Sequence, residues 1–251
     1  MDAILKLSKI NYAYHSYEGE TKALSDISFS VSSGEFTAIV GPSGCGKSTL
    51  LSLIAGLLKP EKGEITICGK TLDESTVNVG YMLQHDHLFE WRSVYRNILL
   101  GLEIQHKVNA QTRKKADALL EQYGLKNFRN AKPSDLSGGM RQRAALIRTL
   151  ILEPELLLLD EHTAALDPKT AEKVMRITEK IVKENALTTL MITHNISNAI
   201  EYGNKTIVMS QGKLLLTIEG EQRANMTVEK LMKLYSDTAE DELSDKMILQ
   251  E

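Results

Sequence analysis

Short apolar runs along the chain alternate with segments of helical periodicity. Three of these runs predict buried strands of a parallel sheet, at Phe36–Val40, Leu156–Leu159 and Leu187–Thr193. A leucine-rich stretch, Thr49–Leu58, follows the first strand and predicts a helix. Strands that alternate with helices in this order are typical of an α/β fold.

Three later segments carry helical patterns. Asn109 predicts the N-cap of one helix and Gly124 its end, and apolar residues recur at helical spacing from Lys169 to Glu184. Beyond Gly220, a tail helix that is solvated or loosely docked is predicted by one apolar face, formed by Val228, Leu231, Met232 and Tyr235. The acidic residues 240–242 follow it.

The turn between the first strand and its helix reads GPSGCGKS, from Gly41 to Ser48. Two glycines that bracket four residues, followed by lysine and a hydroxyl residue, are the pattern of a phosphate-binding loop. A glycine turn without a ligand is the alternative, but the flanking strand and helix favour nucleotide binding. The residues assigned to the nucleotide are Gly41, Pro42, Ser43, Gly44, Cys45, Gly46, Lys47, Ser48 and Thr49.

Polar residues follow the other two predicted strands. Asp160 and Glu161 come directly after the second strand, and His194 comes after the third. Ligands of doubly wound sheets bind at the carboxyl edge of the strands, so Asp160 is expected to reach Mg²⁺ and Glu161 to polarise a water at the γ-phosphate. His194 is placed to hydrogen-bond a γ-phosphate oxygen. The alternatives are that the two acids cap a loop and that the histidine is an ordinary surface residue.

Composition narrows the class of protein. The 251 residues suit one large α/β domain or two lobes, and a net charge of -3 with a pI near 6.1 gives no reason to expect nucleic acid. No apolar run approaches the roughly 18 residues of a membrane-spanning helix, and the N-terminus lacks a signal-peptide pattern, so we expect a cytosolic chain. The two cysteines, Cys45 and Cys68, are expected as thiols, and His85 and His87 as loop residues.

The run Leu136–Met140 reads LSGGM and leads into a helix that is predicted to continue to about Leu152, with Ser137 as its N-cap. This run resembles the signature of ATP-binding cassette (ABC) ATPases. The resemblance covers the chain to about residue 220. It implies a P-loop NTPase (RecA-like) fold with a mostly parallel sheet core, an N-terminal antiparallel β subdomain and an inserted helical subdomain at about 86–150. Residues 1–220 would form the ATPase domain, and residues 221–251 a helical, acidic tail.

The resemblance also implies roles for further residues. Gln84 looks like the Q-loop glutamine that senses Mg²⁺ and the attacking water. The metal-site residues would then be Ser48, Gln84 and Asp160. The catalytic residues would be Glu161, His194 and Gln84. Asp167 looks like part of the D-loop. Tyr14 looks like the residue on which adenine stacks, with Tyr12 as the competitor. Ser137, Gly138 and Gly139 would close over ATP held by a partner subunit.

Two residues depart from the family pattern. The signature ends in Met140 where glutamine is more common, and His162 follows the catalytic acid where proline is usual. Neither change removes a group that the chemistry needs. The backbone N–H groups of the signature are unchanged, so phosphate closure should survive.

The stretch His87–Arg92 contains the only tryptophan, Trp91, and resembles the LLPWR-type sequence of importers for nitrate, sulfonates and taurine. In that family the region receives a coupling helix of the permease, whereas the alternative is that Phe89 and Trp91 pack the core of their own lobe. The implied partners are a second ATPase subunit in a homodimer, a membrane permease and an extracytoplasmic binding protein, with the chain on the inner face of the membrane. An exporter ATPase or a soluble ABC ATPase remains the alternative.

Overall fold

The computed structural model describes residues 3–17, 19–75 and 77–238, so the acidic residues 240–242 lie outside the described chain. The chain forms two compact units. The first unit combines Met1–Val77 with Ala186–Glu251, and the second is Asn78–Asn185. The second unit is therefore an insertion between the two halves of the first.

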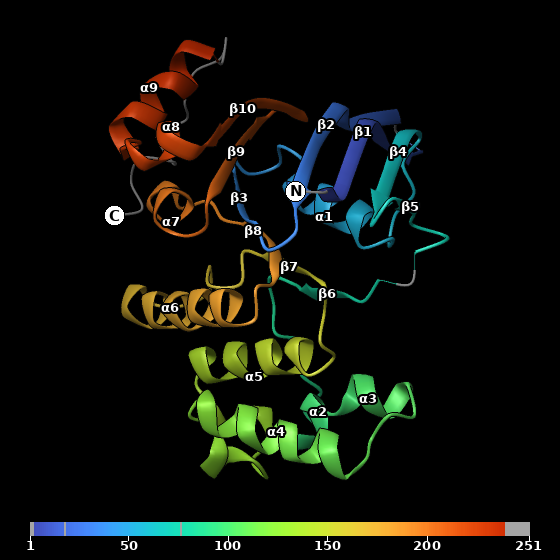
Figure 1. The fold of residues 1–251 in the computed structure, drawn as a ribbon, viewed down its shortest axis with the longest axis vertical. Helices are drawn as coiled ribbons and strands as arrows, with labels where there is room; N and C mark the ends of the chain where they lie inside the picture. The colour runs from blue at the N-terminus through green and yellow to red at the C-terminus, as the bar shows by residue number, and fades with distance from the viewer. Residues whose placement is uncertain (1–2, 18, 76, 239–251) are drawn as a thin grey trace. The chain divides into compact units, whose positions relative to one another are not determined.

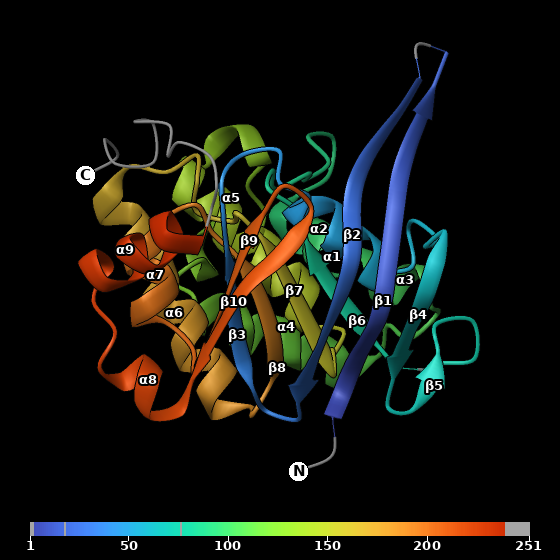
Figure 2. The same ribbon diagram turned by 90° about the horizontal axis from the view of Figure 1, so that it is seen from above.

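An antiparallel sheet opens the first unit. Its four strands have the order β2-β1-β4-β5 and are β1 (Ala3–Ser16), β2 (Gly19–Ser32), β4 (Lys62–Ile67) and β5 (Lys70–Thr71). Figure 2 shows β1 and β2 running side by side as long strands. This sheet is the antiparallel part that the family resemblance implies.

The remaining strands of the first unit surround β3 (Phe36–Val40). It pairs in parallel with β8 (Thr188–Ile192) on one side and β9 (Lys205–Ser210) on the other, while β10 (Lys213–Glu219) is antiparallel to β9. Every residue of β3 and β8 is buried. The two corresponding strands predicted from their apolar runs are thus confirmed.

The helices of the first unit are α1 (Lys47–Ile54), α7 (Ile196–Glu201), α8 (Gly220–Ala224) and α9 (Val228–Thr238). Helix α1 begins two residues before the predicted Thr49, because Gly46 already ends the loop in the left-handed region with φ +99°. It also ends before the predicted Leu58, because the chain turns at Gly56 with φ +72°. Boundaries depend here on glycine conformations that apolar periodicity does not report.

The tail helix α9 is docked on its own unit, so the expectation of a solvated or loosely docked helix was wrong. Leu231 and Tyr235 are buried, and the hydroxyls of Tyr235 and Ser210 lie 3.2 Å apart. The apolar side of α9 faces the end of β3, at Val40, and α9 contacts α7, with both helices on the same side of β9 (Figure 1 and Figure 2). Burial of two large side chains at about 2 kcal/mol each explains why the helix packs down.

The second unit contains two parallel strands, β6 (Val79–Met82) and β7 (Leu156–Asp160). Its helices are α2 (Val94–Ile98), α3 (Leu100–Ile104), α4 (Ala110–Gln122), α5 (Gly138–Leu150) and α6 (Pro168–Glu184), with short 3-10 turns at Lys126–Phe128 and Pro133–Asp135. The predicted cap of α4 is confirmed, since the Asn109 side chain accepts from the backbone of Gln111 and Thr112. Among the described helices, none has the length and apolar character to cross a membrane.

Candidate nucleotide site

The predicted phosphate loop leaves the carboxyl end of β3 and enters α1. Gly44 and Gly46 have φ of +80° and +99°, a region that side chains other than glycine rarely adopt. A Cβ on Gly46 would lie 2.5 Å from the carbonyl oxygen of Ala23. The sequence therefore needs glycine at position 46 for conformation and for space.

Lys47 reaches back across this loop. Its side chain is buried, and Nζ donates to the carbonyl oxygens of Gly41 at 2.8 Å and Pro42 at 2.9 Å. The backbone N–H of Cys45 donates to the Pro42 carbonyl at 3.3 Å, which tightens the turn. The ammonium is thus held within the loop, and the lysine at this position of a phosphate-binding loop reaches the β- and γ-phosphates.

Tyr14 lies next to the first turn of α1. Its hydroxyl is 3.1 Å from Oγ1 of Thr49, and its ring is 46% exposed. Tyr12 packs edge-on against Tyr14 with ring centroids 5.1 Å apart, and it is only half-buried. Of the two tyrosines, Tyr14 has the more accessible ring and the direct link to the loop helix, which favours it as the adenine platform.

Replacing Tyr14 by alanine is expected to raise the Kd for ATP about tenfold, since stacking of a base on an aromatic ring contributes roughly 1–3 kcal/mol. Tyr14→Phe keeps the ring and should change the Kd by less than about twofold. Isothermal titration calorimetry of both variants measures the difference. A larger loss for Tyr12→Ala than for Tyr14→Ala would transfer the role to Tyr12.

His194 follows β8 and comes from the same sheet edge as the phosphate loop. Ile39 and Ile192 are register partners on the parallel strands β3 and β8, and the N–H of Thr193 donates to the carbonyl of Ile39 at 3.1 Å. Both strands therefore end together, with the loop after one and exposed His194 after the other. Within the first unit, the structure places these predicted residues at one edge.

The second unit brings Gln84 and Glu161 together. Met82 and Leu159 are register partners, so the segments that follow β6 and β7 leave the sheet side by side. Nε2 of Gln84 donates to Oε2 of Glu161 at 3.4 Å. Glu161 has φ +44°, an uncommon conformation for glutamate that costs about 1–2 kcal/mol and is typical of functional positions.

Asp160 occupies the last position of β7 and is buried. The hydroxyl of Tyr81 donates to its Oδ2 at 3.4 Å. The proposed Mg²⁺ residues offer hard oxygen donors, with Ser48 in the first unit and Gln84 and Asp160 in the second. Within the described chain, no group of three or more histidine, cysteine, aspartate or glutamate side chains forms a protein-only metal site. Mg²⁺ commonly takes one or two protein ligands beside substrate phosphates, so the oxygen donors that each unit offers suit this ion.

The signature residues lie at the start of α5. Ser137 is the N-cap residue of α5, as predicted, although its hydroxyl makes no capping hydrogen bond. Ser137 and Gly138 are exposed, whereas a Cβ on Gly139 would lie 2.2 Å from Cγ2 of Thr170. Glycine at 139 is therefore required for close packing against α6.

Asp167 caps α6, because its Oδ1 accepts from the N–H of Thr170 at 3.1 Å. Hydrogen bonds from Thr170 lower the pKa of Asp167 and keep it ionised. Because Thr170 also faces Gly139, the signature turn and the predicted D-loop aspartate meet at the same end of the second unit.

His162 is buried beside α6, where its Nε2 lies 3.4 Å from Oγ1 of Thr178. Burial lowers the pKa of His162 to about 4, so the imidazole is neutral near pH 7. It therefore packs as an uncharged side chain in place of the usual proline. Met140 is half-buried in the first turn of α5.

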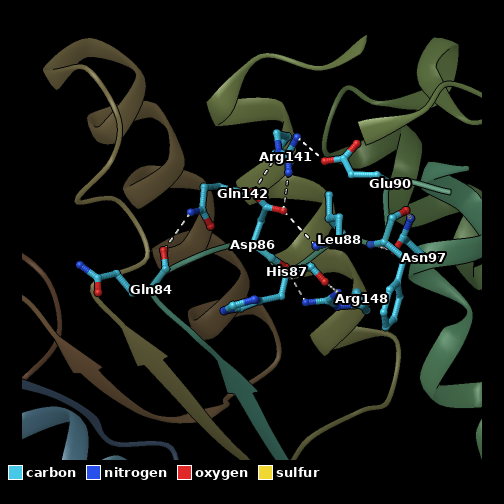
Figure 3. A network of polar contacts seen from close by, with 10 residues as sticks. Gln84, Asp86, His87, Leu88, Glu90, Asn97, Arg141, Gln142 and Arg148 are labelled. Atoms are coloured by element: carbon cyan, nitrogen blue, oxygen red, sulfur yellow. Dashed lines mark hydrogen bonds and ion pairs between the residues drawn. The ribbon is translucent and has the colours of Figure 1, made fainter. Parts of the chain in front are cut away.

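Two features of the second unit differ from, or add to, the sequence interpretation. Phe89 and Trp91 are 43% and 69% exposed, so the interpretation that they pack their lobe's core is wrong. Sequence reasoning also missed the contacts from α5 to the Q-loop, among them the bond from Nε2 of Gln142 to the Gln84 carbonyl at 3.3 Å (Figure 3). The only signal in the sequence was the helical spacing of Arg141 and Arg148 on α5. The expected loop histidines, His85 and His87, are exposed, and the two cysteines form no disulfide.

A family model and two related proteins all point to the same protein family. A family model described as ABC transporter matches residues 24–164. The chain is 41% identical over 208 residues to the uncharacterized ABC transporter ATP-binding protein YtlC of Bacillus subtilis, which covers 83% of this chain and 80% of that protein. It is 41% identical over 202 residues to the taurine import ATP-binding protein TauB of Pelagibacter ubique, which covers 80% of this chain and 76% of that one.

Comparison of the fold with solved structures indicates the same family. A solved dimeric ATP-binding cassette in a post-hydrolysis state, bound to ADP and Pi, superposes with a TM-score of 0.77 and 32% sequence identity. The superposition covers 86% of this chain and 98% of that one. This chain therefore belongs to the ABC transporter family, as one of its ATP-binding and ATP-hydrolysing subunits.

Proposed function

We propose that the chain powers import of a small, anionic or organic solute through a partner permease. The observation that carries the hydrolytic part is the contact between Gln84 and Glu161, in a chain that also has a complete phosphate loop. Import is supported by the similarity to a taurine import ATP-binding protein and by the stretch His87–Arg92, which resembles the corresponding sequence of importers. An exporter ATPase or a soluble ABC ATPase is the alternative.

In the proposed mechanism, Lys47 and the backbone N–H groups of the phosphate loop hold the β- and γ-phosphates. Ser48, Gln84 and Asp160 would hold Mg²⁺, which would supply positive charge to neutralise the phosphates. Glu161 accepts the proton of the attacking water, and the Gln84 amide orients that water. His194 donates a hydrogen bond to a γ-phosphate oxygen, which stabilises the charge that develops there.

We further propose that the active form is a homodimer in which each copy completes the site of the other. The exposed Ser137 and Gly138, together with the N–H groups at the start of α5, suit a phosphate of ATP on the second copy. Asp167 lies at the same end of the unit. The similarity to a dimeric cassette supports this arrangement.

The permease is proposed to dock on Phe89 and Trp91. Their rings contact each other with centroids 5.5 Å apart, and both are exposed although they are large and apolar. Nζ of Lys132 donates to the Trp91 carbonyl at 2.7 Å, which fixes the backbone that presents the ring. Docking there would hold the chain at the inner face of the membrane, beside a permease that receives solute from an extracytoplasmic binding protein.

A capture experiment tests the transport assignment. Tagged Glu161→Gln is expressed in its native cell, trapped with ATP, solubilised gently and analysed by mass spectrometry. We expect a multispan permease to co-purify, and a periplasmic or lipid-anchored binding protein beside it indicates import. The matched variant Glu161→Gln with Trp91→Ala should still bind ATP but capture less permease. Ribosomal, nucleic-acid or soluble assembly partners without a membrane protein would contradict transport and leave the ATPase assignment intact.

A further inference from the structure

Helix α5, whose first turn carries the signature residues, holds the Q-loop through several side chains. Gln142 donates to the Gln84 carbonyl, and the two guanidinium nitrogens NH1 and NH2 of Arg148 donate to the carbonyls of His87 and Asp86, each at 2.7 Å. Figure 3 shows these bonds converging on one short segment. Backbone carbonyls are thus fixed by side chains from one helix, across more than 50 residues of sequence.

Asp86 is the only acidic residue within this segment, residues 84–88, and its carboxylate faces Arg141 and Arg148 of α5. Its Oδ2 accepts from Nε of Arg141 at 2.9 Å and its Oδ1 from NH2 of the same residue at 3.2 Å. Oδ1 also accepts from the backbone N–H of Leu88 at 3.0 Å. The carboxylate therefore binds the helix and folds its own loop at the same time. Glu90 is a second carboxylate on Arg141, at 2.8 Å, but its side chain is 53% exposed.

Charge explains why the acid matters at this position. Burial would raise the pKa of Asp86, but hydrogen bonds from Arg141 and Leu88 and the two positive charges hold it below its usual value. Burial lowers the pKa of Arg148, and the negative charge of Asp86 opposes that shift. The Asp86 carboxylate thus balances the charge of the partly buried Arg148 guanidinium, which would otherwise be costly to bury.

The far side of the loop is anchored independently. Asn97 of α2 is fully buried, accepts from the N–H of Phe89 at 2.8 Å and donates to the Phe89 carbonyl at 3.1 Å. The segment from Gln84 to Leu88 therefore lies between two fixed points and depends on α5 for its own position. Gln84 at its start is the residue that contacts Glu161.

We propose that Asp86 is a positioning residue, which holds the Q-loop to the signature helix so that the Gln84 amide stays beside Glu161. This inference rests on the proposed roles of Gln84 and Glu161 in hydrolysis. Asp86 itself contacts arginines and its own loop, and it acts on the reaction through Gln84.

The first test is Asp86→Asn in the 251-residue chain, assayed for ATP hydrolysis over a range of ATP concentrations. We expect kcat to fall about tenfold, as for the loss of one charge-assisted hydrogen bond, with the KM for ATP changed by less than about twofold. Asp117→Asn is the matched control, because Asp117 accepts from Nε of Arg129 at 2.9 Å in the same unit without contacting the Q-loop. Its kcat should equal that of the wild type.

A double-mutant cycle separates positioning from a general loss of stability. If Asp86 acts through Gln84, Asp86→Asn should lower kcat in the wild-type background and have no further effect in a Gln84→Ala background. Equal losses in both backgrounds would overturn the proposal, as would a wild-type kcat for Asp86→Asn. Arg141→Gln repeats the cycle from the other partner if Asp86→Asn does not fold.

The cycle also distinguishes this proposal from the proposed function. If Glu161→Gln hydrolyses ATP normally, the assignment of Glu161 is wrong, and the positioning role that rests on it is overturned as well. If Glu161→Gln and Gln84→Ala are both impaired but the effects of Asp86→Asn are additive, hydrolysis stands and the positioning role is wrong. Asp86→Glu, which keeps the charge on a longer side chain, should restore part of the lost kcat.

Discussion

Glu161→Gln is expected to hydrolyse ATP at least about 100-fold more slowly than the wild type, because a positioned general base contributes roughly 10²–10⁴-fold to a rate. Its Kd for ATP should stay within about threefold, since the phosphate loop that binds the nucleotide is unchanged. The amide has the size of the carboxylate and keeps an oxygen that can accept from Gln84, 3.4 Å away in the wild type. What it loses is the capacity to take a proton from water.

The measurement combines steady-state phosphate release with titration of ATP binding on the same preparation. Glu172→Gln is the matched control, because it makes the same chemical change in the same unit. Glu172 lies on the exposed side of α6, where it is paired with Arg176. Its turnover should equal that of the wild type. Near-normal hydrolysis by Glu161→Gln would remove Glu161 from the role of general base.

The backbone at Glu161 makes the choice of glutamine important. With φ +44°, position 161 lies in the left-handed region, and the Glu161 carbonyl accepts from the N–H of Ala164 at 2.9 Å in the turn that follows. Glutamine tolerates this conformation about as well as glutamate does, so the comparison isolates the charge. A β-branched replacement would add strain of its own and confuse the two effects.

The sequence predicted those parts of the site that depend on local chemistry. Continuous apolar runs marked β3, β7 and β8, because strands buried on both faces have little choice of residue. The glycines around Lys47 marked the phosphate loop, since Gly46 needs φ +99° and has no room for a Cβ. Parallel strands end at one edge, which placed His194 with the loop. Gln84 was assigned only through the family resemblance, and its contact with Glu161 follows from the pairing of β6 and β7 in the structure.

The remaining features depend on partners that are distant in the sequence. The bond between Asp86 and Arg141 spans 55 residues, and neither residue differs from an ordinary surface charge when it is considered alone. Docking of α9 depends on where Leu231 and Tyr235 meet β9 and α7, which an amphipathic pattern does not specify. The exposure of Trp91 was equally undetermined, because an apolar ring suits both a core and a docking face.

Lys47→Ala is expected to abolish most stabilisation of the protein by ATP. A ligand at 100 times its Kd raises the free energy of unfolding by about 2.7 kcal/mol. If loss of the ammonium weakens ATP about 100-fold, the same concentration contributes only about 0.4 kcal/mol. Thermal unfolding with and without Mg²⁺ and ATP measures this directly, and the expected result is a shift for the wild type that nearly disappears in the variant.

Lys205→Ala provides the matched control, because it removes another buried ammonium from the first unit. Nζ of Lys205 donates to the Ser30 carbonyl at 2.9 Å and lies 3.3 Å from Glu35 and from Glu219. Lys205 pairs with Thr37 near the start of β3, at the opposite end from the phosphate loop. Its loss should lower the unfolding temperature, since the half-buried Glu35 loses its cation, and should preserve the shift with ATP.

Comparison of the two variants thus separates ATP binding from intrinsic stability in the first unit. Lys47→Ala should keep most of its unfolding temperature without ATP, because the carbonyls of Gly41 and Pro42 lose a donor but leave no buried charge behind. Lys205→Ala should show the reverse pattern, with lower intrinsic stability and an intact response to ATP. If Lys47→Ala retains the full ATP-dependent shift, Lys47 does not bind the phosphates, and its role is to hold the loop through those two carbonyls.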